Sequence, residues 1–337
     1  MKNIIKLLIV FLVLSLTTSC NSQNTEVSES SNEEITTEVE TKEDTEESEP
    51  NIEQFVFKTD ATIEESVIYD DDRVTIIAKS LEYNNNSATL NLEIENKSSE
   101  LIKLYAGTMA YSINAINNYM TSDGYLNCEI EAGQIAQDDM SFSKNEMLIH
   151  GISEIALIQV GFEITDENRN EAYTGPLEIR TSAFDAYDMA SDDYLNIMTS
   201  NTFSYTYNTE VNYQSKEELF SENGLSISKP VVMTNKDGEQ SIFFEISNES
   251  DSTVYYSDYN ISINDVLVQE YIWNYDTISA KKRTVQSISL SRLIEKYLES
   301  DDSKELGNIE AITFTVEFKN EDGFVVAEPT EITIHLK

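Results

Sequence analysis

The stretch Leu90-Asn-Leu-Glu-Ile-Glu-Asn96 occurs twice, because Ile242-Phe-Phe-Glu-Ile-Ser-Asn248 repeats it 152 residues later. In both copies apolar residues alternate with others, and each copy ends in Asn followed by a short polar run. Alternation with a period of two, closed by turn-forming residues, predicts a β-strand with one buried face. Two copies at one long interval indicate a domain that the chain uses twice.

The segments around this stretch recur in the same order. Three further pairs match: Asn84–Asn86 with Asn235–Gly238, Ser112-Ile-Asn114 with Ser262-Ile-Asn264, and Ile158–Ile164 with Ile312–Phe318. The first pair predicts hairpin turns, and the last predicts alternating strands. About seven short strands in each copy favour a sandwich, with a small barrel as the structural alternative.

We therefore predict an all-β protein of two tandem immunoglobulin-like antiparallel β-sandwich domains, each with at most a short helical crossing. The first domain covers residues 53–181, a connector covers 182–212, and the second domain covers 213–337. Apolar residues three and four apart predict a short helix within Leu290–Leu298. Thr202–Tyr207 is expected to add a strand from the connector.

The first twenty residues have the pattern of an export signal. Lys2 and Lys6 come before an apolar segment, Leu7–Leu16, which is too short to span a bilayer of about 30 Å. Cys20 follows with a small residue before it, which resembles the lipobox of bacterial lipoproteins, although Thr17 stands where that family usually has Leu. A plain secretory signal is the alternative.

The lipobox resemblance implies that residues 1–19 are a lipoprotein signal peptide and that diacylglycerol is attached to the sulfur of Cys20. The mature chain would then contact the membrane through this lipid, without a transmembrane helix, on the extracytoplasmic side of a bacterial cell envelope. Residues 20–52 are rich in Ser, Thr, Asn and Glu and nearly lack apolar residues, so we expect a disordered acidic tether.

The charge of the chain limits its partners. The sequence has 62 acidic and 22 basic residues, a net charge of −40. Such a surface repels phosphate backbones, so we expect no nucleic-acid partner.

The sequence contains few residues that could carry out catalysis or bind a metal. Cys128 has no second cysteine to pair with once Cys20 is lipidated, and the only histidines are His150 and His335. No nucleophile elbow, phosphate-binding loop or His-containing metal motif is present in the sequence. We predict no enzyme activity, no cofactor and no metal site. Acidic clusters at 70–72, 192–193 and 301–302 are expected to be solvated loops rather than calcium sites, and Met140, Met147 and His150 are expected to be structural rather than metal ligands.

Aromatic residues give the main binding candidate. If Gln269–Asp276 is a strand, Tyr271, Trp273 and Tyr275 share one face. An exposed row of this kind could stack on sugar rings or anchor a protein partner. The alternative is that the row is the buried face, which we favour because the opposite face is too polar to be core: it carries Glu270, Asn274 and Asp276.

The order of segments within each repeat resembles the tandem immunoglobulin-like modules of exported bacterial lipoproteins of unknown function. The clearest passage is His150-Gly-Ile-Ser-Glu-Ile-Ala-Leu-Ile-Gln-Val-Gly-Phe-Glu-Ile164, which is followed by Leu177-Glu-Ile-Arg-Thr181. This resemblance covers Val67–Thr181 and Leu219–Lys337 and brings no catalytic residues. It implies a non-enzymatic cell-surface lipoprotein that presents two domains to a protein or glycan partner or has a structural role in the envelope. The alternative is an extracytoplasmic enzyme or a metal- or ligand-delivery accessory factor.

Overall fold

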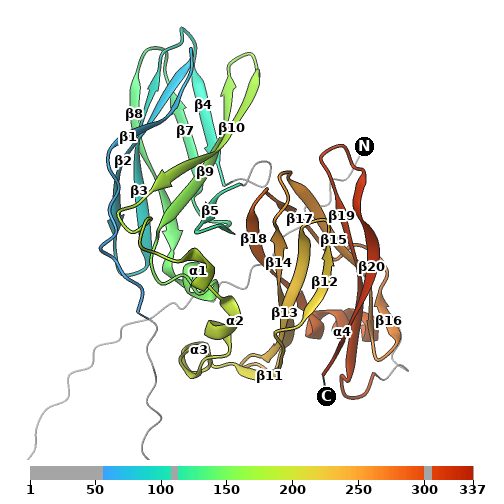
Figure 1. The fold of residues 1–337 in the computed structure, drawn as a ribbon. Helices are drawn as coiled ribbons and strands as arrows, with labels where there is room; N and C mark the ends of the chain where they lie inside the picture. Colours follow the sequence, from blue (N-terminus) through green and yellow to red (C-terminus); the bar gives the residue numbers. More distant parts are fainter. Residues whose placement is uncertain (1–55, 108–112, 300–305, 337) are drawn as a thin grey trace, which may run out of the picture. The chain divides into compact units, whose positions relative to one another are not determined.

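The computed structural model describes residues 56–107, 113–299 and 306–336. The signal peptide, Cys20, the tether and the acidic pair 301–302 all lie outside the described residues. The described residues belong to one compact unit, in which the two predicted repeats are both present as β-structure (Figure 1).

The first repeat is a sandwich of two antiparallel sheets around one hydrophobic core. One sheet has the order β1 (Ser66–Asp70), β2 (Val74–Tyr83), β3 (Ser87–Asn96) and β8 (Ile135–Ser143). The facing strands run in the order β10 (Glu171–Arg180), β9 (Leu157–Asp166), β4 (Ile102–Ala106) and β7 (Leu126–Ile130). The short strand β5 (Ala115–Ile116) also pairs with β9, and β6 (Tyr119–Met120) pairs with β5. Helix α1 (Lys144–Ile149) lies between β8 and β9 in the chain.

The second repeat has the same plan. Its first sheet contains β11 (Glu210–Gln214), β12 (Glu218–Glu222), β13 (Leu225–Thr234), β14 (Gln240–Asn248) and β18 (Lys282–Ser289). The facing sheet contains β15 (Val254–Ile263), β16 (Val266–Gln269), β17 (Asn274–Ile278), β19 (Ala311–Lys319) and β20 (Val325–His335). The predicted helix is present as α4 (Leu290–Glu299) between β18 and β19.

Both sandwiches are connected in the Greek-key manner of immunoglobulin-like folds. Strands β2-β3-β8 face β10-β9-β4-β7 in the first sandwich, and β13-β14-β18 face β20-β19-β15-β17 in the second. The all-β sandwich prediction is therefore confirmed. Because strands far apart in sequence must pair, each fold depends on non-local contacts rather than on local propensity.

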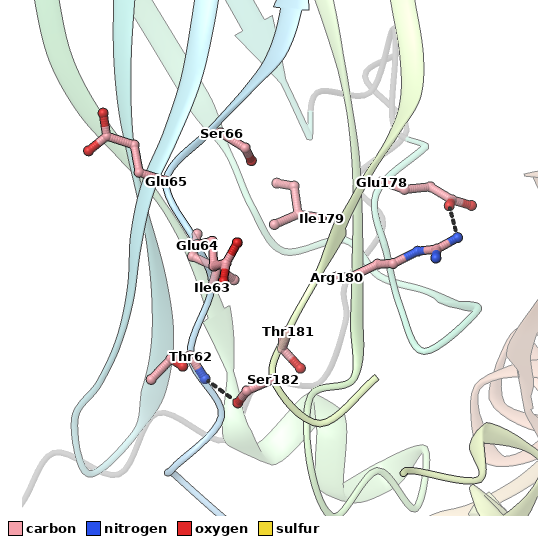
Figure 2. Close-up of a pocket in the computed structure, with 10 residues that line it drawn as sticks. All are labelled: Thr62, Ile63, Glu64, Glu65, Ser66, Glu178, Ile179, Arg180, Thr181 and Ser182. Atoms are coloured by element: carbon pink, nitrogen blue, oxygen red, sulfur yellow. Dashed lines mark hydrogen bonds and ion pairs between the residues drawn. The ribbon is translucent and has the colours of Figure 1, made fainter. Parts of the chain in front are cut away.

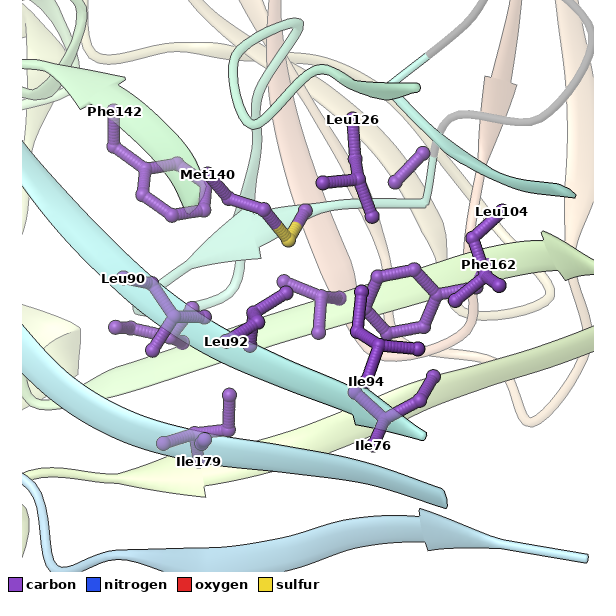
Figure 3. Close-up of a cluster of buried hydrophobic side chains, with 14 of the residues drawn as sticks. Ile76, Leu90, Leu92, Ile94, Leu104, Leu126, Met140, Phe142, Phe162 and Ile179 are labelled. Atoms are coloured by element: carbon purple, nitrogen blue, oxygen red, sulfur yellow. The ribbon is translucent and has the colours of Figure 1, made fainter. Parts of the chain in front are cut away.

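The repeated stretch forms the centre of each core. Figure 3 shows Leu90, Leu92 and Ile94 of β3 among the side chains of the facing sheet, and all three are at most 1% exposed. Their counterparts Ile242, Phe244 and Ile246 of β14 are fully buried in the second core. Each buried side chain contributes about 1.5–3 kcal/mol of transfer free energy, so the alternation fixes which face of the strand packs inward.

The Asn that ends each copy makes equivalent hydrogen bonds in the two sandwiches. Asn96 Nδ2 donates to the carbonyls of Glu100 (2.7 Å) and Ile130 (2.9 Å), and its Oδ1 accepts from Ser98 N at 2.9 Å. Asn248 repeats this pattern on Ser252, Ile278 and Ser250. Both side chains are fully buried, so each satisfies backbone groups that water cannot reach.

Ser112 of the predicted pairing Ser112-Ile-Asn114 with Ser262-Ile-Asn264 lies outside the described residues, and the pairing of Asn114 with Asn264 is wrong by three residues. The structural counterpart of Asn264 is Asn117: both have positive φ, at 50° and 48°, and both begin a two-residue turn. Asn117 Oδ1 accepts from the backbone N–H groups of Ala156 and Leu157, as Asn264 Oδ1 does from those of Glu310 and Ala311. The left-handed turn and these bonds favour an Asn at both positions.

The expected strand at Thr202–Tyr207 is also wrong, because the segment is helix α3 (Asn201–Tyr207). Ser200 caps its first turn by accepting from Phe203 N at 3.1 Å. Phe203 and Tyr207 lie one helical turn apart, with ring centroids 4.5 Å from each other. Together with helix α2 (Tyr194–Met198), α3 packs the connector against Val231 and Met233 of β13.

Candidate functional site

The segment that carries the three candidate aromatic residues is not one continuous strand. Strand β16 ends at Gln269 and β17 begins at Asn274, so Tyr271 and Trp273 lie in the intervening turn. Tyr271 is 76% exposed and Tyr275 is 60% exposed, whereas Trp273 is partly buried against the second core. The expected burial of the row is wrong for the two tyrosines, and the expected single face is wrong because the chain bends between them.

Tyr275 is part of a broader aromatic surface on the outer side of the second sandwich. Its ring stacks with that of Tyr255 on β15, with centroids 5.8 Å apart and planes 16° apart. We call this pair, together with Tyr271 and Trp273 of the adjoining turn, the aromatic surface. Flat exposed rings of this kind provide large contact area at a small conformational-entropy cost.

Helix α4 places two cations against Trp273. The guanidinium of Arg292 lies 5.6 Å from the centre of the Trp273 ring, and Lys296 Nζ lies 4.9 Å from it. Both residues occupy one face of α4 because they are four residues apart. Cation–π contacts therefore hold the indole against α4.

A buried carboxylate holds the aromatic segment in place. Asp258 is fully buried, and it accepts hydrogen bonds from Asn274 N (3.1 Å), Asn274 Nδ2 (2.8 Å) and Tyr256 OH (2.9 Å). Its own carbonyl accepts from Trp273 N at 2.9 Å. Burial raises the pKa of Asp258 to about 6 despite these bonds. Asp258 was not among the residues predicted from the sequence, although a single Asp within a Tyr-rich strand was a visible signal.

A second polar cluster lies where the two sandwiches meet. Tyr119 and Arg283 join β6 to β18 as a parallel bridge. The Tyr119 ring lies between the His150 ring, stacked at 4.8 Å, and the Arg283 guanidinium, at 4.1 Å. The Tyr119 hydroxyl donates to the carboxylate of Glu245, which is the Glu of the second copy of the repeated stretch.

The connector completes this inter-sandwich cluster. Arg283 donates to the carbonyls of Asp192 (3.1 Å) and Met189 (3.0 Å). Lys229 Nζ lies 3.2 Å from Asp193 Oδ1 and 3.0 Å from Glu245 Oε1. The connector also approaches the end of α1 closely, because a Cβ on Gly151 would lie 2.6 Å from the backbone oxygen of Asp193.

The titration behaviour of the inter-sandwich cluster follows from its burial. Desolvation raises the pKa of Asp192 to about 6, although Tyr187 and Asn117 donate to its carboxylate. Burial and the nearby charge of Arg283 lower the pKa of His150 to about 4, so the imidazole is neutral at pH 7. These polar groups bond mainly to one another, an arrangement that joins the sandwiches to the connector.

The other residues considered as reactive or metal-binding candidates lie in the core or in hydrogen-bonded turns. Cys128 is buried, and desolvation raises its pKa to about 11, which disfavours the reactive thiolate. Met140 and Met147 pack in the first core. Asp71 Oδ1 accepts from the backbone N–H groups of Arg73 and Val74 in a turn. Within residues 56–107, 113–299 and 306–336, no three His, Cys, Asp or Glu side chains gather as a metal site would require, and no helix is long and apolar enough to cross a bilayer.

No family model and no curated protein matches the chain. Three solved structures overlap with it weakly. Red sea bream transglutaminase is 8% identical over 77% of this chain, with a TM-score of 0.17, and the chain spans only 29% of that protein. The receptor tyrosine kinase Torso is 8% identical, with coverage of 83% and 75% and a TM-score of 0.18. A GH2 β-galacturonidase from Eisenbergiella tayi is 10% identical, with coverage of 74% and 35% and a TM-score of 0.18. Scores this low support no shared activity.

Proposed function

We propose that the protein is a non-enzymatic lipoprotein of the bacterial cell surface, anchored through lipid on Cys20, and that its second sandwich binds a protein or glycan partner. The observation that carries the binding proposal is the exposure of Tyr271 and Tyr275, at 76% and 60%, together with the stacking of the Tyr275 ring on that of Tyr255. An exposed tyrosine on a strand, such as Tyr275 of β17, supplies stacking area without ordering a loop on binding.

The support beneath the aromatic surface favours binding over a purely structural role. Asp258 is a fully buried carboxylate whose bonds to Asn274 fix the start of β17 and thereby the position of Tyr275. Arg292 and Lys296 hold Trp273 from the other element, α4. A surface whose backbone is fixed by a buried carboxylate, and whose indole is held by cation–π contacts from a second element, is preorganised for a ligand.

The experiment compares the full-length chain with a Tyr271→Ala, Tyr275→Ala double variant on a glycan array and in a pull-down from envelope extract. The matched control is Tyr205→Ala, because Tyr205 is a tyrosine of α3 that is 80% exposed and lies outside the aromatic surface. We expect the double variant to lose at least about tenfold in affinity for the glycan or protein that the native chain retains. Equal retention by the native chain and the double variant would refute the proposal.

A further inference from the structure

A groove opens along one edge of the first sandwich, between the segment that leads into β1 and the end of β10. Its volume is about 570 Å³, and it is lined by residues 62–66 on one side and 178–182 on the other. The two segments meet at one end, where Ser182 N donates to the carbonyl of Thr62 (2.7 Å) and Thr62 N donates to Ser182 Oγ (3.0 Å). Beyond this contact they separate (Figure 2).

The β10 side of the groove is an open strand edge. Thr181 N donates to Ala156 O at 3.0 Å and so points toward β9, whereas Ser182 N points the other way, toward Thr62. Backbone groups alternate along a strand, so the N–H and C=O of Glu178 and Arg180 also point away from β9 and toward the groove. Both residues are exposed, and no hydrogen bond joins their backbone to residues 62–66. Among the residues that the structure describes, this edge of β10 therefore has no strand partner in the groove.

The floor of the groove is apolar. Figure 2 shows Ile179 pointing into the gap, whereas Glu178 and Arg180 point away from it. Ile179 belongs to the first core and is 3% exposed, and Ile63 packs against the same core. A strand laid along β10 would place every second side chain over this floor and the others outward, beside Glu178 and Arg180.

The charges around the groove indicate what kind of peptide segment it could bind. Glu64, Glu65 and Glu178 line it together with one cation, Arg180, so acidic residues outnumber basic ones in the lining. Arg180 lies 3.7 Å from the Glu178 carboxylate, and Lys79, outside the lining, lies 2.8 Å from that of Glu65. The whole chain carries a net charge of −40, which disfavours a second copy or an acidic segment of this chain as the occupant. Opposite charges across a strand pair stabilise it, so basic outward residues fit best.

We propose that this groove binds an extended basic segment of a partner protein, which adds as a strand to the free edge of β10. The inference concerns the first sandwich and does not depend on the aromatic surface of the second. Backbone pairing supplies the affinity, the floor at Ile179 selects apolar residues at alternate positions, and the carboxylates select Lys or Arg between them.

The test uses the full-length chain in detergent and a fluorescent peptide in which four Val alternate with four Lys. Control peptides replace Lys by Glu, or carry N-methyl groups on the backbone. We expect saturable binding of the Val/Lys peptide only, weaker at high salt, with slowed amide exchange at Glu178 and Arg180. Binding of the Val/Glu or N-methyl peptide with equal affinity, protection elsewhere in the chain, or a dimer of this chain that occupies the groove would overturn the proposal.

Two variants locate the site. Arg180→Pro removes an N–H that faces the groove while keeping those that pair with β9, and we expect it to abolish binding with an unchanged circular dichroism spectrum. Glu178→Lys should weaken binding roughly tenfold, whereas the matched control Glu163→Lys, on β9 outside the groove, should have little effect. Should Arg180→Pro unfold, Glu178→Lys remains decisive. Equal affinity of the two Lys variants would refute the site.

Discussion

Replacing Asn248 by Ala tests whether the Asn that ends the repeated stretch stabilises the second sandwich. Its Nδ2 donates to the carbonyls of Ser252 and Ile278, both at 2.9 Å, and its side chain is fully buried. Ala would remove both of these bonds, at about 1–3 kcal/mol each, although the Ser252 carbonyl would keep Ser250 Oγ as a donor at 3.0 Å. We expect the free energy of unfolding to fall by about 2–5 kcal/mol, a large part of the stability of an ordinary domain.

The assay is urea unfolding followed by circular dichroism, in which we expect the midpoint to fall by about 1–2 M. Asn96→Ala should have a similar effect on the first sandwich, because its bonds to Glu100 and Ile130 are equivalent. The control is Asn91→Ala: Asn91 lies on the outer face of β3, is only half-buried, and donates to Ser80 Oγ. A loss below about 1 kcal/mol for Asn248→Ala, or one no larger than that of the control, would refute the reasoning.

Three further predictions concern the other buried groups and the anchor. Tyr119→Phe and Glu245→Gln should each lower stability by about 1–3 kcal/mol, and a double-mutant cycle should show coupling between them; additive losses would contradict the inter-sandwich bond. Asp258 has a folded pKa of about 6 against an ordinary value of 3.8, so the folded state keeps its proton longer as the pH rises. Its contribution to stability therefore falls between pH 3.8 and pH 6, by about 3 kcal/mol in all. Urea titrations at pH 4 and pH 7 should show that Asp258→Asn removes this loss. An unchanged difference in unfolding free energy between the two pH values would contradict the prediction. Cys20→Ala should release the protein from membranes into the soluble fraction, and continued membrane retention would contradict lipidation of Cys20.

Local patterns predicted the parts of the fold in which neighbouring residues determine the structure. The alternation in Leu90–Asn96 predicted a buried strand face, and Asn235–Gly238 predicted the hairpin between β13 and β14. The three- and four-residue spacing after Leu290 predicted α4. Each pattern acts within a few residues, so it can be seen without the partner strands.

The errors arose where a distant contact determined the outcome. Thr202–Tyr207 alternates like a strand, but the cap at Ser200 and packing against β13 favour the helix α3. Tyr271 and Tyr275 were expected to be buried as one face, yet the bonds of Asp258 bend the chain before β17. Neither the sheet that Asp258 belongs to nor its burial is visible in the spacing of residues around Tyr271.

The repeated stretch separates what the sequence by itself determined from what the tertiary structure decided. Both copies carry a Glu at the fourth position, Glu93 and Glu245, and the alternation alone predicts a strand around each. Glu93 remains half-buried on the outer face of β3. Glu245 is 5% exposed and bonds to Tyr119 and Lys229, because the connector and the first sandwich cover that face of β14. The period of a strand is set by its own backbone, whereas the burial of a charge depends on which surface packs over it.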